Sequence, residues 1–287
     1  MNKPSLTIFS IPKPFSGKAD LAQRNAINSW IQLTPFAEVI LLGDDPGVAE
    51  AAAELKVCHL PGVETNEQGT PVLSSAFAMA REHSTCDYLA YCNCDIILLN
   101  DFQIAVQRLF KATELEQFLG TGQRTNIDLE SKVEFTDVQA VDALIKTARE
   151  NGQLDSIMCK DFFVFPRNMF EGIPKFAVGR GNWDNWIIKE AKRLGVPVVS
   201  ITDCVMAIHQ NHGYSHAGNR WDCYVNGDEA RKNQELGAGR HWVAGSSFDY
   251  RLGPNSLRRN RMKYVAGDFW FDFPRAIRLV AQLFRNK

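Results

Sequence analysis

Two side chains that carry oxygen, Asn93 and Asp95, follow the apolar run of residues 88–92 and are separated only by Cys94. Hard cations such as Mg²⁺ and Mn²⁺ prefer oxygen ligands and leave positions free for the oxygens of a diphosphate. A cation held here would neutralise the charge that builds on a departing diphosphate. The competing interpretation is a turn in which both side chains cap the backbone. The tripeptide alone does not decide between the two.

Histidines gather further along the chain. Three of the six lie between residues 209 and 216, directly after the apolar run of residues 205–208. A neutral imidazole is a common metal ligand. His209 is the best placed because it follows the apolar run at once. The alternative is a polar loop with surface histidines, but the clustering favours a site, so we expect His209 to complete a coordination shell begun by Asp95.

A glycine-rich segment, Gly179-Arg180-Gly181, precedes a helical pattern over residues 183–194. Glycines let other groups approach the backbone closely, and the N-terminus of a helix favours anions. Asp184, in the first turn, is placed to act as a base that takes a proton from a hydroxyl group. The alternative is that Asn182 or Asp184 only caps the helix. Both interpretations stay open at this point.

Strand and helix patterns alternate over the first hundred residues. Apolar runs predict strands over 6–11, 38–42, 57–60 and 87–91, and helical spacing predicts helices over 19–33, 48–55 and 70–82, the last with Thr70 as its cap. Such alternation is typical of a mainly parallel sheet with helices on both faces. Ligands of these sheets bind at the carboxyl ends of the strands, which is where Asp44, Asp45, Asn93 and Asp95 fall.

Beyond residue 100 the pattern is less regular. Strands are predicted over 118–120, 161–165 and 196–202, and helices over 138–150 and 183–194. The predicted fold class is therefore α/β, with a Rossmann-like, mainly parallel central sheet flanked by helices and followed by a basic helical extension.

Composition limits the classes of function. Of the 287 residues 45% are hydrophobic, and the net charge of -1 argues against general nucleic-acid binding. No stretch of about 20 uncharged apolar residues predicts a membrane span, and Met1-Asn2-Lys3-Pro4 does not begin a secretory signal. The seven cysteines include no C-x-x-C pair, so we expect reduced core thiols and a cytoplasmic protein.

The last segment, residues 251–287, contains nine Lys or Arg and two Asp. Phe269-Trp270-Phe271 precedes a helical pattern over residues 274–285 that is apolar on one side and basic on the other. A basic amphipathic helix of this kind can lie in a membrane interface, which would suit a lipid-linked acceptor. The alternative is a helix that packs on the domain with its arginines in water.

Taken in order, these motifs resemble the GT-A glycosyltransferases over most of residues 5–216. The resemblance is strongest at Asn66-Glu67-Gln68-Gly69-Thr70-Pro71, Asn93-Cys94-Asp95-Ile96-Ile97-Leu98, Gly122-Gln123-Arg124, the region of Asp184, and His209-Gln210-Asn211-His212. In that superfamily a D-x-D motif at the end of a central strand holds the metal and the donor diphosphate. Here Asn93 replaces its first Asp.

The resemblance implies roles for individual residues. Asp95 and His209 would bind the metal, Asn93 would contact the ribose or a metal-bound water, and Asp184 would be the base of an inverting reaction. The nucleotide donor would lie against Ser10, Ile11, Pro12, Asp44 or Asp45, Asn93 and Arg124. Residues 1–250 would form the catalytic domain, with a nucleotide-sugar half (1–100) and an acceptor and catalytic half (101–220), and residues 251–287 would form the tail.

The implied activity is the transfer of a sugar from a nucleotide diphosphate sugar to a hydroxyl of a saccharide or lipid-linked acceptor in polysaccharide biosynthesis. It would need Mn²⁺ or Mg²⁺, and the tail would add a peripheral contact at the inner face of the membrane. One alternative is an inactive GT-A-like domain that binds a nucleotide or glycan, which Asn93 keeps open. A sugar-nucleotide pyrophosphorylase needs a glycine-rich, Arg-containing loop after its first strand, and residues 10–16 do not form one.

Overall fold

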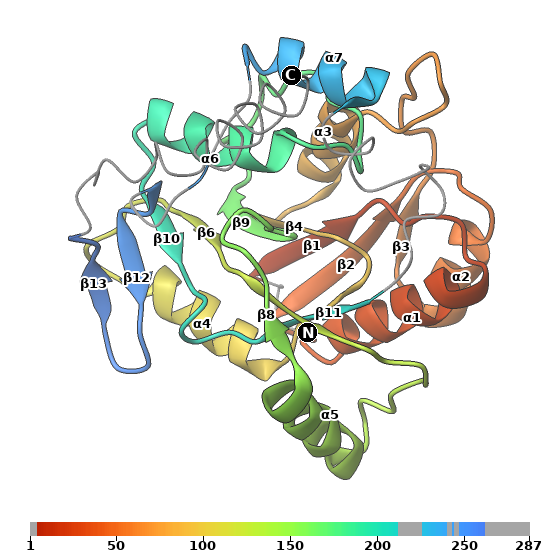
Figure 1. Ribbon diagram of the computed structural model, residues 1–287, viewed down its shortest axis with the longest axis vertical. Helices are drawn as coiled ribbons and strands as arrows, with labels where there is room; N and C mark the ends of the chain where they lie inside the picture. The colour runs from red at the N-terminus through yellow and green to blue at the C-terminus, as the bar shows by residue number, and fades with distance from the viewer. Residues whose placement is uncertain (1–4, 212–225, 240–242, 244–246, 262–287) are drawn as a thin grey trace, which may run out of the picture.

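The computed structural model describes residues 5–211, 226–239, 243 and 247–261. In these ranges the chain forms two sheets with helices packed around them (Figure 1). The larger sheet has the strand order β13-β12-β10-β6-β9-β4-β1-β2-β3, and the smaller one has the order β5-β11-β7-β8. The prediction of a mainly parallel α/β core is confirmed.

The larger sheet carries two parallel groups joined by one antiparallel strand. Its strands are β1 (Leu6–Ser10), β2 (Ala37–Leu42), β3 (Cys58–Leu60), β4 (Tyr88–Cys92), β6 (Leu119–Thr121), β9 (Phe162–Pro166), β10 (Val198–Ser200), β12 (Tyr250–Leu252) and β13 (Leu257–Arg259). Strands β3, β2, β1 and β4 are parallel, as are β6, β10 and β12. Strand β9 runs antiparallel between β4 and β6.

The smaller sheet brings distant segments together beside the first. It consists of β5 (Ile96–Ile97), β11 (Ala207–Gln210), β7 (Arg124–Ile127) and β8 (Gln153–Leu154). Strand β11 runs antiparallel to β5 and parallel to β7. Ile96 and Ile97, which follow Asn93 and Asp95 closely in the sequence, therefore do not extend β4 but form a separate strand in the second sheet.

Seven helices lie in the described ranges: α1 (Gly17–Ile31), α2 (Val48–Leu55), α3 (Leu73–His83), α4 (Asn100–Phe110), α5 (Val138–Asn151), α6 (Trp183–Arg193) and α7 (Asp228–Leu236). One buried cluster joins one face of the sheet to α1, α2 and α4, and a second joins the other face to α3 and α6. Strand β1 shows the alternation that a sheet imposes, because Ile8 belongs to the first cluster and Phe9 to the second.

Aromatic rings fill the second cluster. Phe77 of α3 stacks on Phe165 with 5.3 Å between ring centroids and meets Phe9 edge-on at 5.0 Å. The cluster continues to Tyr91, whose ring meets Trp183 edge-on at 5.2 Å. Such pairs add to the free energy gained from burial. The cluster thus joins the end of β4 to the start of α6, the two elements that carry Asn93 and Asp184.

The predicted start of the third helix is wrong. Helix α3 begins at Leu73, and its N-cap is Val72 rather than Thr70. Val72 forms a bridge with Ala177, and Val178 donates its N–H to the carbonyl of Pro71. These long-range backbone hydrogen bonds hold the residues before Leu73 in an extended form, which a local helix signal does not reveal.

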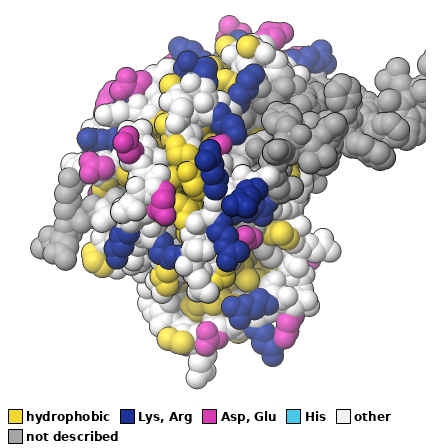
Figure 2. Space-filling view, turned by 90° about the vertical axis from the view of Figure 1, so that its left-hand side faces the viewer, with side chains coloured by type: hydrophobic (Ala, Val, Ile, Leu, Met, Phe, Trp, Pro, Cys, Tyr) yellow, Lys and Arg dark blue, Asp and Glu magenta, His cyan; other side chains and the backbone are white. Residues whose placement is uncertain are grey.

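The predicted domain boundary between residues 250 and 251 falls inside β12, so residues 251–259 belong to the central sheet. Strand β13 is its edge, where Arg258, Arg259 and Arg261 are exposed. Figure 2 shows Lys and Arg side chains gathered on this side of the molecule. Charge on an edge strand discourages pairing with another chain.

The helix predicted over residues 274–285 and the aromatic residues before it lie outside the described residues, as do His212 and His216. Among the helices that the structure describes, none is both long and apolar enough to cross a membrane.

Replacing Gly152 by Ala tests the packing at the end of α5. A Cβ at this position would lie 2.2 Å from the carbonyl oxygen of Ala148 and 2.5 Å from Cγ2 of Thr125. We expect Gly152→Ala to lower the free energy of unfolding by about 1–3 kcal/mol, because neighbouring backbone must move. Urea denaturation measures the change. Gly172→Ala is the matched control, since a Cβ there meets no atom within 4 Å; equal losses in both variants would contradict the packing described.

Candidate active site

A cleft of about 890 Å³ opens at the carboxyl ends of β1 and β4. These strands are parallel neighbours, so the residues that follow them meet at one edge of the sheet. The predicted site residues that line the cleft are Ile11, Pro12, Asp45, Asn93, Asp95, Arg124, Asp184 and His209. The structure therefore brings together most of the residues selected from the sequence, from six separate segments of the chain.

Two of the predicted residues do not line the cleft. Ser10 is fully buried as the last residue of β1. Asp44 turns to the neighbouring loop, where its Oδ2 accepts a hydrogen bond from the backbone N–H of Gly62 at 2.7 Å. Asp45, its neighbour in sequence, faces the cleft instead. Burial, and then the charge of Asp44, raises the pKa of Asp45.

Asp95 and His209 face each other across the pairing of β5 with β11. His209 is opposite Ile96 in the register, and its Nε2 lies 3.9 Å from Oδ2 of Asp95. A carboxylate oxygen and an imidazole nitrogen at this separation fit a donor set for Mn²⁺. In the described ranges no group of three or more His, Cys, Asp or Glu side chains could hold a metal ion.

Helix α1 fixes the strand that follows Asp95. Nε1 of Trp30 donates to the carbonyl of Ile96 at 2.9 Å, and Oγ of Ser29 accepts from the N–H of Leu98 at 3.1 Å. Gln210 of β11 donates through Nε2 to the carbonyl of Ala22 in the same helix, at 2.8 Å. All these groups are buried, so breaking any one hydrogen bond would leave a polar group unsatisfied.

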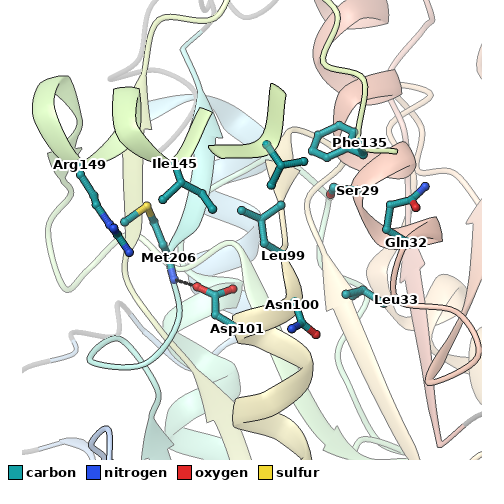
Figure 3. Close-up of a pocket in the computed structure, with 11 residues that line it drawn as sticks. Ser29, Gln32, Leu33, Leu99, Asn100, Asp101, Phe135, Ile145, Arg149 and Met206 are labelled. Atoms are coloured by element: carbon teal, nitrogen blue, oxygen red, sulfur yellow. Dashed lines mark hydrogen bonds between the residues drawn. The ribbon is translucent and has the colours of Figure 1, made fainter. Parts of the chain in front are cut away.

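A second cavity, of about 310 Å³, lies at the opposite end of the same strand pair (Figure 3). Leu99, Ile145 and Met206 form apolar parts of its wall. Its carboxylate, Asp101, already accepts the backbone N–H of Met206 at 2.8 Å and that of Phe102. No predicted site residue lines this cavity. Asp101 acts in the fold by holding the start of β11, the strand that carries His209.

Both polar atoms of the Asn93 side chain form hydrogen bonds. Nδ2 donates to Oδ1 of Asp161 at 2.7 Å, and Oδ1 accepts from the hydroxyl of Tyr91 at 2.9 Å. The backbone N–H of Asn93 also donates to the carbonyl of Asp161 at 2.7 Å. Asp161 lies next to β9 and was not selected from the sequence.

Arg124 lies between two carboxylates. Its Nη1 donates to both carboxylate oxygens of Asp161 at 3.1 Å, and its Nε donates to Oδ2 of Asp155 at 2.9 Å. Burial opposes the charge of the guanidinium, but the two carboxylates outweigh it and raise the pKa of Arg124. Burial also works to raise the pKa of Asp155, yet hydrogen bonds, including one from Asn126, and the charge of Arg124 lower it to about 2.

Asp184 sits in the first turn of α6, on the other side of the cleft. Burial raises its pKa to about 6, although the charge of Lys160 works to lower it. Lys160 is itself buried, and its Nζ donates to the carbonyl of Ile157. Burial lowers the pKa of Lys160 to about 8 against the opposing charge of Asp184. Lys160 was missed because a single lysine beside a predicted strand carries no sequence signal.

Asn182 is the N-cap of α6, but its side chain makes no capping hydrogen bond. Nδ2 donates instead to the carbonyl of Gly239 at 3.0 Å. The backbone of Asn182 is left-handed, with φ of 89°, a conformation that residues other than glycine seldom adopt. The side chain of Asn182 therefore holds the start of α6 through a tertiary contact rather than as a cap.

Helix α7, which was not predicted from the sequence, holds two loops at the rim of the cleft. Glu229 accepts hydrogen bonds from Nδ2 of Asn66 and Nε of Arg180, both at 2.7 Å. Asn233 accepts the N–H of Ala177 at 2.8 Å and donates to its carbonyl at 3.0 Å. Because these pairs are 49 to 163 residues apart, local sequence patterns could not reveal them.

The pH dependence of stability tests the Glu229 contacts. Burial works to raise the pKa of Glu229, but hydrogen bonds from Asn66 and Thr70 and the contact with Arg180 lower it below 4.5. A lowered pKa means that the contribution to stability is present above pH 4.5 and is lost as the pH falls through the folded-state pKa.

We expect Glu229→Gln to lower the free energy of unfolding at neutral pH by about 1–3 kcal/mol, because its charged partner, Arg180, loses the carboxylate that it binds. Denaturation measured across pH should show that the difference in free energy of unfolding between wild type and Glu229→Gln becomes smaller at acidic pH. Glu235→Gln, on the exposed side of α7, is the control and should change little. A difference that does not depend on pH would argue against the ion pair.

The sequence matches no family model and no curated protein. The fold is similar to solved structures. Glucosyl-3-phosphoglycerate synthase from Mycobacterium tuberculosis, in complex with Mn²⁺, UDP and phosphoglyceric acid, matches 91% of this chain and 88% of its own with a TM-score of 0.51 and 13% identity. The complex of that synthase with Mg²⁺ and UDP matches 90% and 86%, with a TM-score of 0.50 and 13% identity. The described chain has a GT-A type fold.

Proposed function

We propose that this chain is a metal-dependent glycosyltransferase that moves a sugar from a nucleotide diphosphate sugar to a hydroxyl of a saccharide or lipid-linked acceptor. The observation that carries the proposal is the meeting of Asp95 and His209, 3.9 Å apart, in a cleft that also contains Asp184. The complex of a protein of similar fold with Mn²⁺ and UDP supports it.

The donor binds in the half of the cleft next to β1 and β4. Asp95 and His209 hold Mn²⁺ or Mg²⁺, which when bound neutralises charge on the diphosphate. Lys13, whose Nζ is 4.0 Å from Oδ2 of Asp95, adds a cation at the same place. Ile11, Pro12 and Asp45 line the part of the cleft that would receive the nucleoside.

The acceptor binds beside α6. Its hydroxyl oxygen forms the new bond to the sugar carbon as the bond from that carbon to the diphosphate oxygen breaks. Asp184 takes the hydroxyl proton, and the nucleotide diphosphate leaves. A pKa of about 6 leaves this carboxylate ionised at neutral pH while making it a stronger base than an exposed aspartate.

A domain that binds a nucleotide or glycan without turnover is the second candidate, and the replacement at Asn93 favours it. Thermal-shift measurements with Mn²⁺ and UDP, GDP, CMP and dTDP sugars identify the donor, because a ligand of the native state raises its melting temperature. Release of the free nucleotide from that donor then separates the two candidates. Binding with no release, with or without an added acceptor, would favour the second.

Replacing Asp95 tests the metal site. We expect Asp95→Ala to remove the Mn²⁺-dependent rise in melting temperature given by the donor, because the carboxylate ligand is lost. Titration calorimetry with Mn²⁺ should show affinity weakened by roughly tenfold or more. Asp87→Ala, at the exposed opposite end of β4, should behave as wild type. Donor binding that stays Mn²⁺-dependent in Asp95→Ala would refute the assignment.

Turnover measured across pH tests the base. A carboxyl group must be ionised to accept a proton, so kcat should fall as the pH drops below about 6, the pKa of Asp184. We expect Asp184→Asn to lower kcat by about 10²–10⁴ and to lose this acid limb, while the donor Kd stays unchanged. Asp142→Asn, on the exposed face of α5, is the control. Unchanged turnover in Asp184→Asn would exclude the base role.

A further inference from the structure

Residues 93 and 161 are neighbours across two strands. The antiparallel pairing of β4 with β9 ends with Cys92 opposite Phe162, so the next pair in the register is Asn93 and Asp161. The backbone continues this pairing, because the N–H of Asn93 donates to the carbonyl of Asp161. The identity of either side chain therefore constrains the other.

A carboxylate at position 93 would conflict with this pairing. Nδ2 of Asn93 is 2.7 Å from Oδ1 of Asp161, and an aspartate there would bring two like charges into the same space. Like charges directly opposite each other on paired strands are destabilising. An amide is the neutral side chain of the same shape that can donate a hydrogen bond to the carboxylate.

Counting the charges at this end of the cleft shows what Asp161 contributes. Arg124 is paired with both Asp155 and Asp161, which leaves one negative charge in excess, and the neighbouring charges of Lys160 and Asp184 offset each other. Asp95 adds another beside His209. A divalent cation would balance these two charges once Lys13 is engaged by diphosphate.

We propose that Asp161 supplies, at the metal and diphosphate site, the negative charge that a D-x-D motif carries on its first residue, and that Asn93 is neutral in order to bind this carboxylate. The inference rests on the function proposed above. Asp161 is a positioning residue, because its carboxylate orients Asn93 and Arg124 and its charge acts on the cation through space. The substitution at position 93 is then a relocation of charge from the end of β4 to the start of β9.

A double-mutant cycle at residues 93 and 161, with Mn²⁺ as the only ligand, tests the proposal. The variants are Asn93→Asp, Asp161→Asn and the double exchange, with Asp87→Asn as an exposed control at the other end of β4. Electron paramagnetic resonance of free Mn²⁺ measures affinity, and thermal unfolding in metal-free buffer at neutral pH measures stability.

We expect Asp161→Asn to weaken Mn²⁺ binding by roughly tenfold, because one nearby charge is lost. Asn93→Asp alone should lower the melting temperature by roughly 5 °C, from repulsion between the carboxylates. The double exchange keeps one carboxylate and one amide in the pair. It should return Mn²⁺ affinity to within about threefold of wild type and recover the melting temperature.

Three outcomes would overturn the inference while leaving the proposed function in place. They are wild-type affinity in Asp161→Asn, a double exchange that binds as weakly as Asp161→Asn, and an Asn93→Asp variant that keeps wild-type stability and binds Mn²⁺ more tightly. A wild-type chain that binds no Mn²⁺ refutes the metal site and this inference together. Mn²⁺ binding with the expected cycle but no sugar transfer would refute only the proposed activity.

Discussion

The pairing of β5 with β11 is the constraint on which the site depends. It brings Asp95 and His209 together across more than a hundred residues of chain and places a carboxylate oxygen opposite an imidazole nitrogen. The strands are short, so the pair is held from outside: Trp30 of α1 binds β5, and Asp101 at the start of α4 binds the residue before β11. The second cavity lies at the end of the pair away from Asp95 and His209.

The sequence was sufficient to predict the features that local residue patterns determine. Apolar runs and helical spacing located the elements of the parallel core, and the rule that ligands bind at strand ends selected Asn93 and Asp95 correctly as residues of the cleft. It failed where long-range backbone contacts override a local signal, as at Thr70, where a bridge to the segment at Ala177 replaces the expected helical turn. Ser10 and Asp44 do not line the cleft for a related reason, because a strand end exposes only some of its side chains on one side.

Two of the residues that sequence reasoning missed, Asp161 and Glu229, act through partners far away in the chain. Asp161 pairs with Asn93 and Arg124, and Glu229 pairs with Asn66 and Arg180. The register of β4 against β9 also changes how Asn93 is interpreted. In the sequence, Asn93 departs from the D-x-D motif and supports an inactive domain. In the structure, Asn93 is the hydrogen-bond donor that the buried carboxylate of Asp161 requires.

The two halves of the cleft are held by different means. The strands beside Asp95 and His209 are fixed by hydrogen bonds from α1 and α4. Helix α6, which carries Asp184, begins after Asn182. The left-handed backbone of Asn182 costs about 1–3 kcal/mol. Hydrogen bonds from its side chain to the carbonyls of Asn233 and Gly239, around the end of α7, offset that cost. Helix α7 therefore adds to the aromatic contact between Trp183 and Tyr91 in holding the start of α6, which carries Asp184. The position of Asp184 thus depends in part on a helix that lies outside the parallel core.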